Sequence, residues 1–103
     1  MSGVEFNFRS KVWLWKSETA PGSWHFVTLP KKDSAVISDL FHVNKRGFGS
    51  IKVKVDVGST SWSTSIFPGE NKCYILPLKA QVRKAENIKV GTMLKYTISI
   101  EAQ

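Results

Sequence analysis

Apolar and polar residues alternate along most of this chain. Between residues 51 and 57, isoleucine and valine take every second position, and Lys52, Lys54 and Asp56 take the positions between them. Residues 4–8 and 93–100 follow the same rule. A period of two is typical of a strand with one buried face and one exposed face, so the pattern predicts a protein built mainly from β-strands.

Six strands are expected, separated by turns and two short helices. They span residues 4–16, 23–29, 51–57, 62–67, 73–76 and 93–100. In the first, apolar residues occupy both faces around positions 12–15, which predicts cover on both sides or a bulge near Ser10. Pro30 and Pro77 end two strands because proline cannot donate a ladder hydrogen bond.

The helices are expected at residues 34–41 and 78–85. Asp33 or Ser34 is a suitable N-cap for the first. Its apolar residues fall at helical spacing and predict one buried stripe. They are Val36, Ile37, Leu40 and Phe41.

The order of these elements occurs twice. A strand ends in Leu-Pro, a helix follows, a glycine closes the helix, and a long alternating strand comes next, first over residues 24–57 and again over 74–100. Such a repeat predicts a single domain, residues 1–103, folded as one small six-stranded β-barrel with two short helices and an internal pseudo-twofold repeat. Closure would hide the sheet edges. Val53, Val55, Ile98 and Ile100 should share its interior.

Composition adds a strong positive charge. Fifteen Lys and Arg against eight Asp and Glu give a net charge of +7. Such a surface attracts nucleic acid or another polyanion, although the basic residues are spread along the chain and could serve solubility alone. Cys73 is the only cysteine, which fits a reducing cytoplasm. No segment has the ~20 apolar residues that cross a bilayer, so no membrane association is expected.

Five segments resemble a known family. They read WHFVTLP at 24–30, RGFGS at 46–50, WSTSIFP at 62–68, YILPLK at 74–79 and VRKA at 82–85. In this order, and over about residues 6–100, the chain resembles a bacterial and archaeal family, the domain of unknown function DUF1905. The resemblance implies a double-split β-barrel related to swapped-hairpin transcription factors and antitoxins, and it implies no established activity.

The first candidate site is a group of basic residues. Lys79 and Arg83 are four residues apart, so they share a helix face with Lys84 beside them, and Arg46 lies in a basic turn before a glycine. If the repeat brings the turn and the helix together, the arginines could grip a phosphate or carboxylate in a fork. The alternative interpretation is a solvated helix face with structural ion pairs.

The second candidate site is the polar strand at residues 59–65. Its hydroxyls, with Trp62, Thr64 and Ser65 at the centre, could line a pocket for a small polar ligand or a stacked base. Trp62 could instead pack in the core, because tryptophan and threonine both favour strands.

The remaining aromatic and reactive residues are expected to be structural. Trp13, Trp15 and Trp24 should pack in the core or at a barrel end, the alternative being a stacking platform for single-stranded nucleic acid. His25, His42 and Cys73 have no partners at metal-ligand or nucleophile spacing, so neither a metal nor a cofactor is expected.

These patterns favour a non-catalytic binding module, monomeric or homodimeric, that recognises an anionic ligand or nucleic acid through Arg46, Lys79, Arg83 and Lys84. The alternative is a small-molecule-binding protein or enzyme with its site at the barrel mouth, formed by Trp62, Thr64, Ser65 and Lys79.

Overall fold

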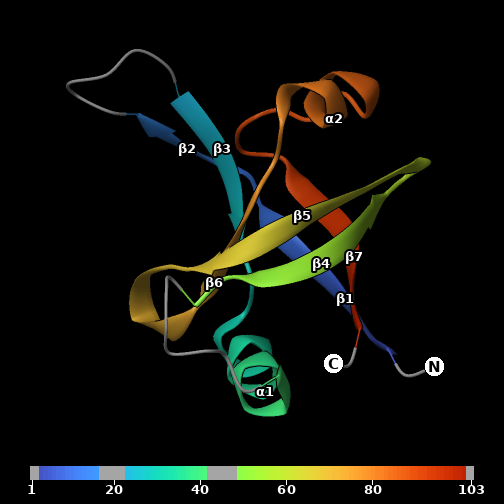
Figure 1. Cartoon of the computed structure of the whole chain (residues 1–103). Coiled ribbons are helices and arrows are strands. Elements are labelled where there is room, and N and C mark those ends of the chain that lie inside the picture. Colours follow the sequence, from blue (N-terminus) through green and yellow to red (C-terminus); the bar gives the residue numbers. More distant parts are fainter. Residues whose placement is uncertain (1–2, 17–22, 42–48, 102–103) are drawn as a thin grey trace.

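The computed structural model describes residues 3–16, 23–41 and 49–101 (Figure 1). It contains seven strands, two α-helices and one short 3-10 helix. The strands are β1 (Gly3–Lys11), β2 (Trp13–Lys16), β3 (Ser23–Thr28), β4 (Ile51–Val57), β5 (Thr60–Pro68), β6 (Tyr74–Pro77) and β7 (Met93–Glu101), and the helices are α1 (Lys31–Phe41), η1 (Glu70–Lys72) and α2 (Ala80–Ala85).

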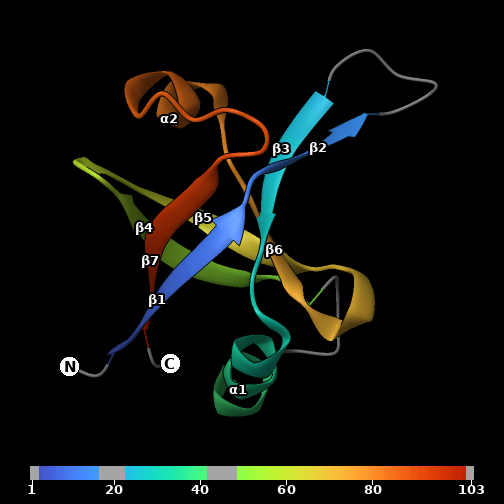
Figure 2. The same cartoon turned by 180° about the vertical axis from the view of Figure 1, so that it is seen from behind.

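The strands form one curled antiparallel sheet, a half-barrel, in the order β1-β7-β4-β5-β6-β3-β2. The two edge strands, β1 and β2, are consecutive in the chain, so the sheet curls until its edges meet at one segment (Figure 2). Closure into a complete double-split barrel stays a prediction.

The expected first strand is interrupted at Val12, which is why the described chain has seven strands and not six. The backbone N–H of Val12 donates to the carbonyl oxygen of Thr92 at 2.9 Å, and its carbonyl oxygen accepts from the N–H of Gly91 at 2.8 Å. Both groups bind the turn before β7, so the chain leaves the β7 ladder here and pairs with β3. The buried positions keep the same alternation from Phe8 through Ser10 to Val12, so the bulge expected near Ser10 does not change the phase, and the break at Val12 is a change of partner strand.

The repeated order of elements is confirmed, because β3-α1-β4 in the first half corresponds to β6-α2-β7 in the second. Corresponding strands also pair with each other. β3 pairs antiparallel with β6, where Val27 faces Leu76, and β4 pairs antiparallel with β7, where Val55 faces Ile98. In both views α1 and α2 lie at opposite ends of the sheet.

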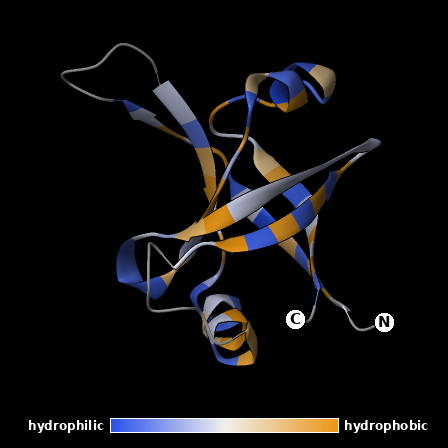
Figure 3. Ribbon diagram, in the orientation of Figure 1, coloured by the Kyte–Doolittle hydropathy of each residue, from blue (hydrophilic) through white to orange (hydrophobic). Residues whose placement is uncertain are grey.

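The concave side of the sheet holds the core. Val53, Val55, Ile98 and Ile100 are all buried there, as the repeat predicted. Hydrophobic and hydrophilic residues alternate visibly along β4 (Figure 3), and the interior set joins one apolar cluster with Leu29, Ile37, Ile66, Leu76 and Val82.

Helix α1 differs from its expected form. It begins at Lys31, directly after Pro30, so neither Asp33 nor Ser34 is its N-cap. Ser34 lies in the first turn, where its side chain accepts a hydrogen bond from the N–H of Tyr74 at 3.0 Å. Of the expected apolar stripe, Ile37 is buried and Phe41 is partly buried.

Val36 and Leu40, the other two members of that stripe, are 41% and 54% exposed. Only Ile37 and Phe41 of the expected stripe therefore contact the core, because α1 covers only one end of the half-barrel. Helix α2 is also shorter than expected, beginning at Ala80. In the described part of the chain, no helix is long and apolar enough to span a membrane.

Candidate functional site

The convex face of the sheet collects the polar residues of three neighbouring strands. Lys54 faces Ser63 of β5 on one side and Ser99 of β7 on the other, and Lys52 faces Ser65. Because side chains on one face of a sheet recur every second residue, these five lie on one surface, opposite the valines of β4.

These residues line an open groove of about 670 Å³, here called the lysine–hydroxyl groove: Lys52, Lys54, Ser63, Ser65 and Ser99, with Phe67 at one end and Val53, Thr64 and Glu101 bordering it. Two ammonium groups and three hydroxyls offer donors to an anionic oxygen. Glu101 is the one carboxylate among the lining residues, so the groove has a net positive charge. The arrangement can bind an anion along strands that are held by ladders on both sides.

A second surface on the same convex face is aromatic. Pairing of β2 with β3 places Trp15 opposite Trp24 and Trp13 opposite Phe26, and β6 continues the face with Pro77 and Ile75. We call this set the aromatic surface. It consists of Trp13, Trp15, Trp24, Phe26, Phe67, Ile75 and Pro77, which line a shallow groove of about 440 Å³.

The aromatic surface corrects the expectation that Trp13, Trp15 and Trp24 pack in the core or at a barrel end. Trp15 is 47% exposed and Trp24 is 57% exposed, while Trp13 is only half-buried. The reason is topological, because β2 and β3 extend beyond the rest of the sheet and no described element covers their convex side (Figure 1). Neither exposed tryptophan belongs to the core cluster.

Phe67 joins the two surfaces. It lines the lysine–hydroxyl groove and also the aromatic surface, where it pairs across β5 and β6 with Ile75. At 38% exposure its ring is open to solvent. The convex face therefore carries one continuous band, basic and hydroxyl-bearing at one end and aromatic at the other.

The structure separates the residues of the second predicted site. Trp62 is buried with the core, on the face opposite Ser63 and Ser65. Ser65 lines the lysine–hydroxyl groove and Thr64 borders it. Lys79 is the N-cap of α2 and does not line this groove.

Three residues of the predicted basic site lie together on or beside α2. Lys79 is its N-cap and exposed, Lys84 is exposed, and Arg83 is half-buried. The Arg83 side chain donates from Nε to the carbonyl oxygen of Leu78 at 3.0 Å, which ties it to its own helix start. Arg46 lies outside the described residues, so its position relative to this helix stays a prediction.

His25 lies on the concave side of β3, near this helix. Its Nδ1 is buried and has no hydrogen-bond partner among the described residues. Burial, and after it the positive charge of Arg83, lowers the pKa of the His25 imidazole below its usual range. The neutral form is therefore favoured, consistent with the expectation of a packed residue. His42 lies outside the described residues.

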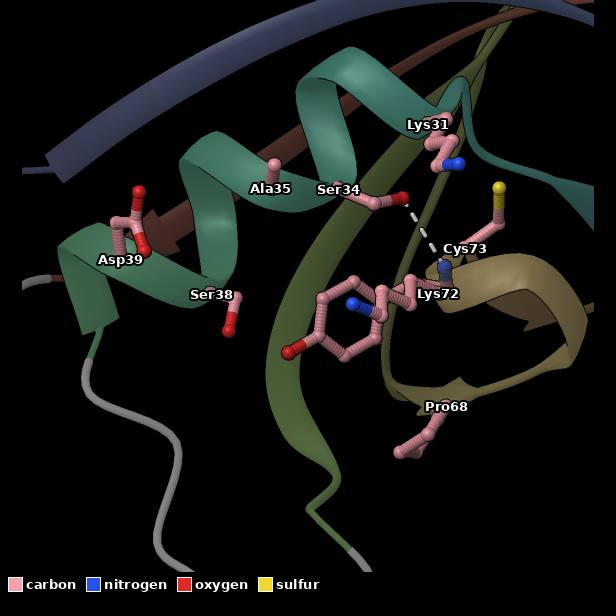
Figure 4. A pocket seen from close by; sticks show the side chains of 9 residues that line it. Lys31, Ser34, Ala35, Ser38, Asp39, Pro68, Lys72 and Cys73 are labelled. Atoms are coloured by element: carbon pink, nitrogen blue, oxygen red, sulfur yellow. Dashed lines mark hydrogen bonds between the residues drawn. The ribbon is translucent and has the colours of Figure 1, made fainter.

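A pocket of about 340 Å³ lies between α1 and the segment that contains η1 (Figure 4). Ser34, Ser38 and Tyr74 bring hydroxyl groups to it, and Lys31, Lys72 and Asp39 also line it. Burial raises the pKa of the Tyr74 phenol, against a smaller opposing effect of a hydrogen bond with Ser38. Cys73 is partly buried and also lines this pocket.

The comparison with protein families agrees with the five sequence segments. The model of the domain of unknown function DUF1905 matches residues 8–98 of the 103-residue chain. The chain belongs to the DUF1905 family. Among curated proteins, no match was found.

In this DUF1905 chain the groove combines Ser63, Thr64 and Ser65, which lie in the second predicted site, with Lys52 and Lys54, which the sequence analysis treated only as a charged strand face. The signal was present, because the turn at Gly58 and Ser59 fixes the hairpin register that sets Lys52 and Lys54 beside Ser65 and Ser63. Among the residues that the DUF1905 structure describes, no group of three or more His, Cys, Asp or Glu could hold a metal ion.

Proposed function

We propose that this protein is a non-catalytic binding module that recognises an anionic polymer, nucleic acid, through the convex face of its sheet. The observation that carries the proposal is the row Ser63–Lys54–Ser99, with Lys52 and Ser65 beside it, on an open groove. Lysine ammonium groups and serine hydroxyls are among the side-chain groups that contact phosphate oxygens in nucleic-acid complexes.

The charge of the whole chain supports this choice of ligand. A net charge of +7 on 103 residues draws polyanions to the surface before specific contacts form. The groove is open along the sheet, which suits a polymer better than a small molecule that needs enclosure. We further propose that the half-barrel closes as a double-split barrel and that the protein works in the cytoplasm, where a lone cysteine stays reduced.

The test is a salt series of oligonucleotide binding, followed by fluorescence anisotropy, for the wild type and for Lys52→Gln/Lys54→Gln. Each phosphate contact contributes about 0.7–0.9 to the slope of log affinity against log salt. The double variant should therefore lose about 1.4–1.8 of that slope if both lysines contact phosphates. Lys32→Gln/Lys89→Gln makes the same charge change at two exposed positions outside the groove. This control variant should keep the part of the slope that comes from phosphate contacts in the groove.

Lys79 and Lys84, at α2, provide a competing anion site. The same assay distinguishes this site from the lysine–hydroxyl groove. If Lys79→Gln/Lys84→Gln lowers the slope and Lys52→Gln/Lys54→Gln does not, the contact surface is α2. If no oligonucleotide binds at ~50 mM salt, where electrostatic binding is strong, the proposal is wrong for both surfaces.

The pocket between α1 and η1 supports a second candidate function, binding of a small polar molecule. Its volume of about 340 Å³ falls within the range of small-ligand sites, and its hydroxyls could orient such a ligand. A ligand bound there should raise the melting temperature of the wild type and lose that effect in Ser38→Trp, which would fill the pocket entrance. A library of small metabolites that gives no such shift would argue against this candidate.

A further inference from the structure

We propose that the nucleic acid on the convex face is single-stranded, with its bases stacked on the aromatic surface and its phosphates on the lysine–hydroxyl groove. This inference rests on the proposed function and adds the class of nucleic acid. It depends on the position of Phe67, through which the two surfaces form one band.

The aromatic rings are held in place before any ligand binds. The indole N–H of Trp13 donates to Thr28 Oγ1 at 2.9 Å, which fixes that ring against the sheet. Phe26 packs between its neighbours, with its ring centroid 5.1 Å from that of Trp13 and 6.2 Å from that of Trp24. The Trp24 and Phe26 rings are nearly parallel, 11° apart. Little side-chain entropy would therefore be lost on stacking.

The exposed tryptophans of this surface are not part of the apolar core cluster. Trp15 and Trp24, 47% and 57% exposed, leave large apolar areas in water. Large exposed apolar patches mark binding surfaces, and rigid aromatic rings beside cationic groups are the feature that bases stack upon. Here the cationic groups are Lys52 and Lys54, on the strand next to β5, which carries Phe67.

A duplex could not use this surface, because its bases are stacked on each other and present only their edges. A single strand exposes the faces of its bases. The aromatic surface crosses four adjacent strands, β2, β3, β6 and β5, or about 14 Å at the usual strand spacing. Four-stranded sheet faces of this kind stack about two or three bases. The adjoining groove would then take the phosphates of the nucleotides that follow.

The experiment uses three fluorescein-labelled probes of equal length at ~50 mM salt: a 12-nucleotide oligothymidine, a 12-nucleotide strand with abasic sites, and a 12-base-pair duplex. We expect the oligothymidine to bind at least about fivefold more tightly than the abasic strand, the gain expected from one stacked base. Trp24→Ala should weaken oligothymidine binding by a similar factor and leave abasic binding unchanged. Trp24→Phe keeps a ring and should retain most of the affinity.

Equal binding of the oligothymidine and the abasic strand, with Lys52→Gln/Lys54→Gln still weakening both, would overturn this inference and leave the proposed function standing. If the wild type binds none of the three probes, both this inference and the proposed function are wrong. If Trp24→Ala instead abolishes a concentration-dependent dimer in sedimentation and leaves oligothymidine binding intact, the aromatic surface is a protein interface and the inference is wrong. Because Trp24 is mostly exposed, its variants should fold, and circular dichroism confirms this before binding is measured.

Discussion

The Ser10 side-chain oxygen lies 2.8 Å from the hydroxyl oxygen of Tyr96 inside the half-barrel. Ser10 also donates its hydroxyl proton to the carbonyl oxygen of Thr28 at 2.9 Å, so the Tyr96 hydroxyl is the donor in the first bond. The pair connects β1, β7 and β3 just before the chain changes partners at Val12. A polar chain of three groups therefore stands at the seam where the two sheet edges meet.

Ser10→Ala should destabilise the fold by about 1–3 kcal/mol, because two buried polar groups lose their partner. Urea unfolding followed by tryptophan fluorescence measures the change. Ser63→Ala, at an exposed position of β5, is the matched control and should stay within about 0.5 kcal/mol of the wild type. An unchanged midpoint for Ser10→Ala would mean that water replaces the lost hydroxyl.

Tyr96 should make the fold sensitive to alkaline pH. Burial raises the pKa of the Tyr96 phenol, more than the hydrogen bond with Ser10 lowers it. The unfolded chain releases this proton near pH 10, so the contribution of Tyr96 to stability is complete below about pH 10 and is lost as the pH rises above it.

Tyr96→Phe removes the titrating group and should flatten the fall in unfolding free energy between about pH 9.5 and 11. Comparing the two proteins cancels the titration of lysines, which both contain. Parallel pH curves for the two proteins would show that Tyr96 ionises freely in the folded state.

Ser34→Ala should also destabilise the protein by about 1–3 kcal/mol, since it removes the acceptor for the buried N–H of Tyr74 and leaves that donor unpaired. Thermal unfolding detects this. Lys32→Ala, exposed on the same helix, controls for the change in helix propensity. In Ser34→Thr the hydroxyl is kept, and recovery of part of the loss would assign the effect to the hydrogen bond.

His25 should make the fold sensitive to mild acid. Its pKa is lowered in the folded state, so the unfolded chain binds the proton first, and stability falls as the pH drops below about 6.5. Replacing Arg83 with Gln removes the smaller of the two causes and should shift the His25 titration upward, as seen in the imidazole resonances by NMR. A His25 titration at or above the usual value would contradict the burial of its Nδ1.

Much of the sheet could be predicted from sequence because strand alternation states which residues share a face. The alternation of Ile51, Val53 and Val55 identified a core strand correctly. Alternation does not state which face of a strand is covered by other elements. For this reason the burial predicted for Trp15 and Trp24 was wrong. Trp15 and Trp24 alternate as core residues would, yet the strands that carry them extend past every described element.

The apolar residues on both faces at positions 12–15 indicated an irregularity in the first strand but did not predict that the strand breaks at Val12. The break depends on hydrogen bonds to Gly91 and Thr92, about eighty residues away along the chain, and no local feature reports those. The β4 and β5 residues of the groove, by contrast, follow from one hairpin register, which the turn residues alone could have supplied. Ser99 joins them only through the long-range pairing of β4 with β7. Prediction was therefore good where contacts are local and poor where distant segments decide exposure.

Pairing of β3 with β6 and of β4 with β7 has a consequence for how such a chain could arise. Identical subunits related by a twofold axis bind through the same surface, each strand beside its own copy in reverse direction. A polypeptide with only one strand–helix–strand unit would thus already possess the edges needed to assemble with a second molecule of itself. Gene duplication followed by fusion would join such a homodimer into one chain that keeps the β3–β6 and β4–β7 ladders, and the two halves would afterwards be free to diverge.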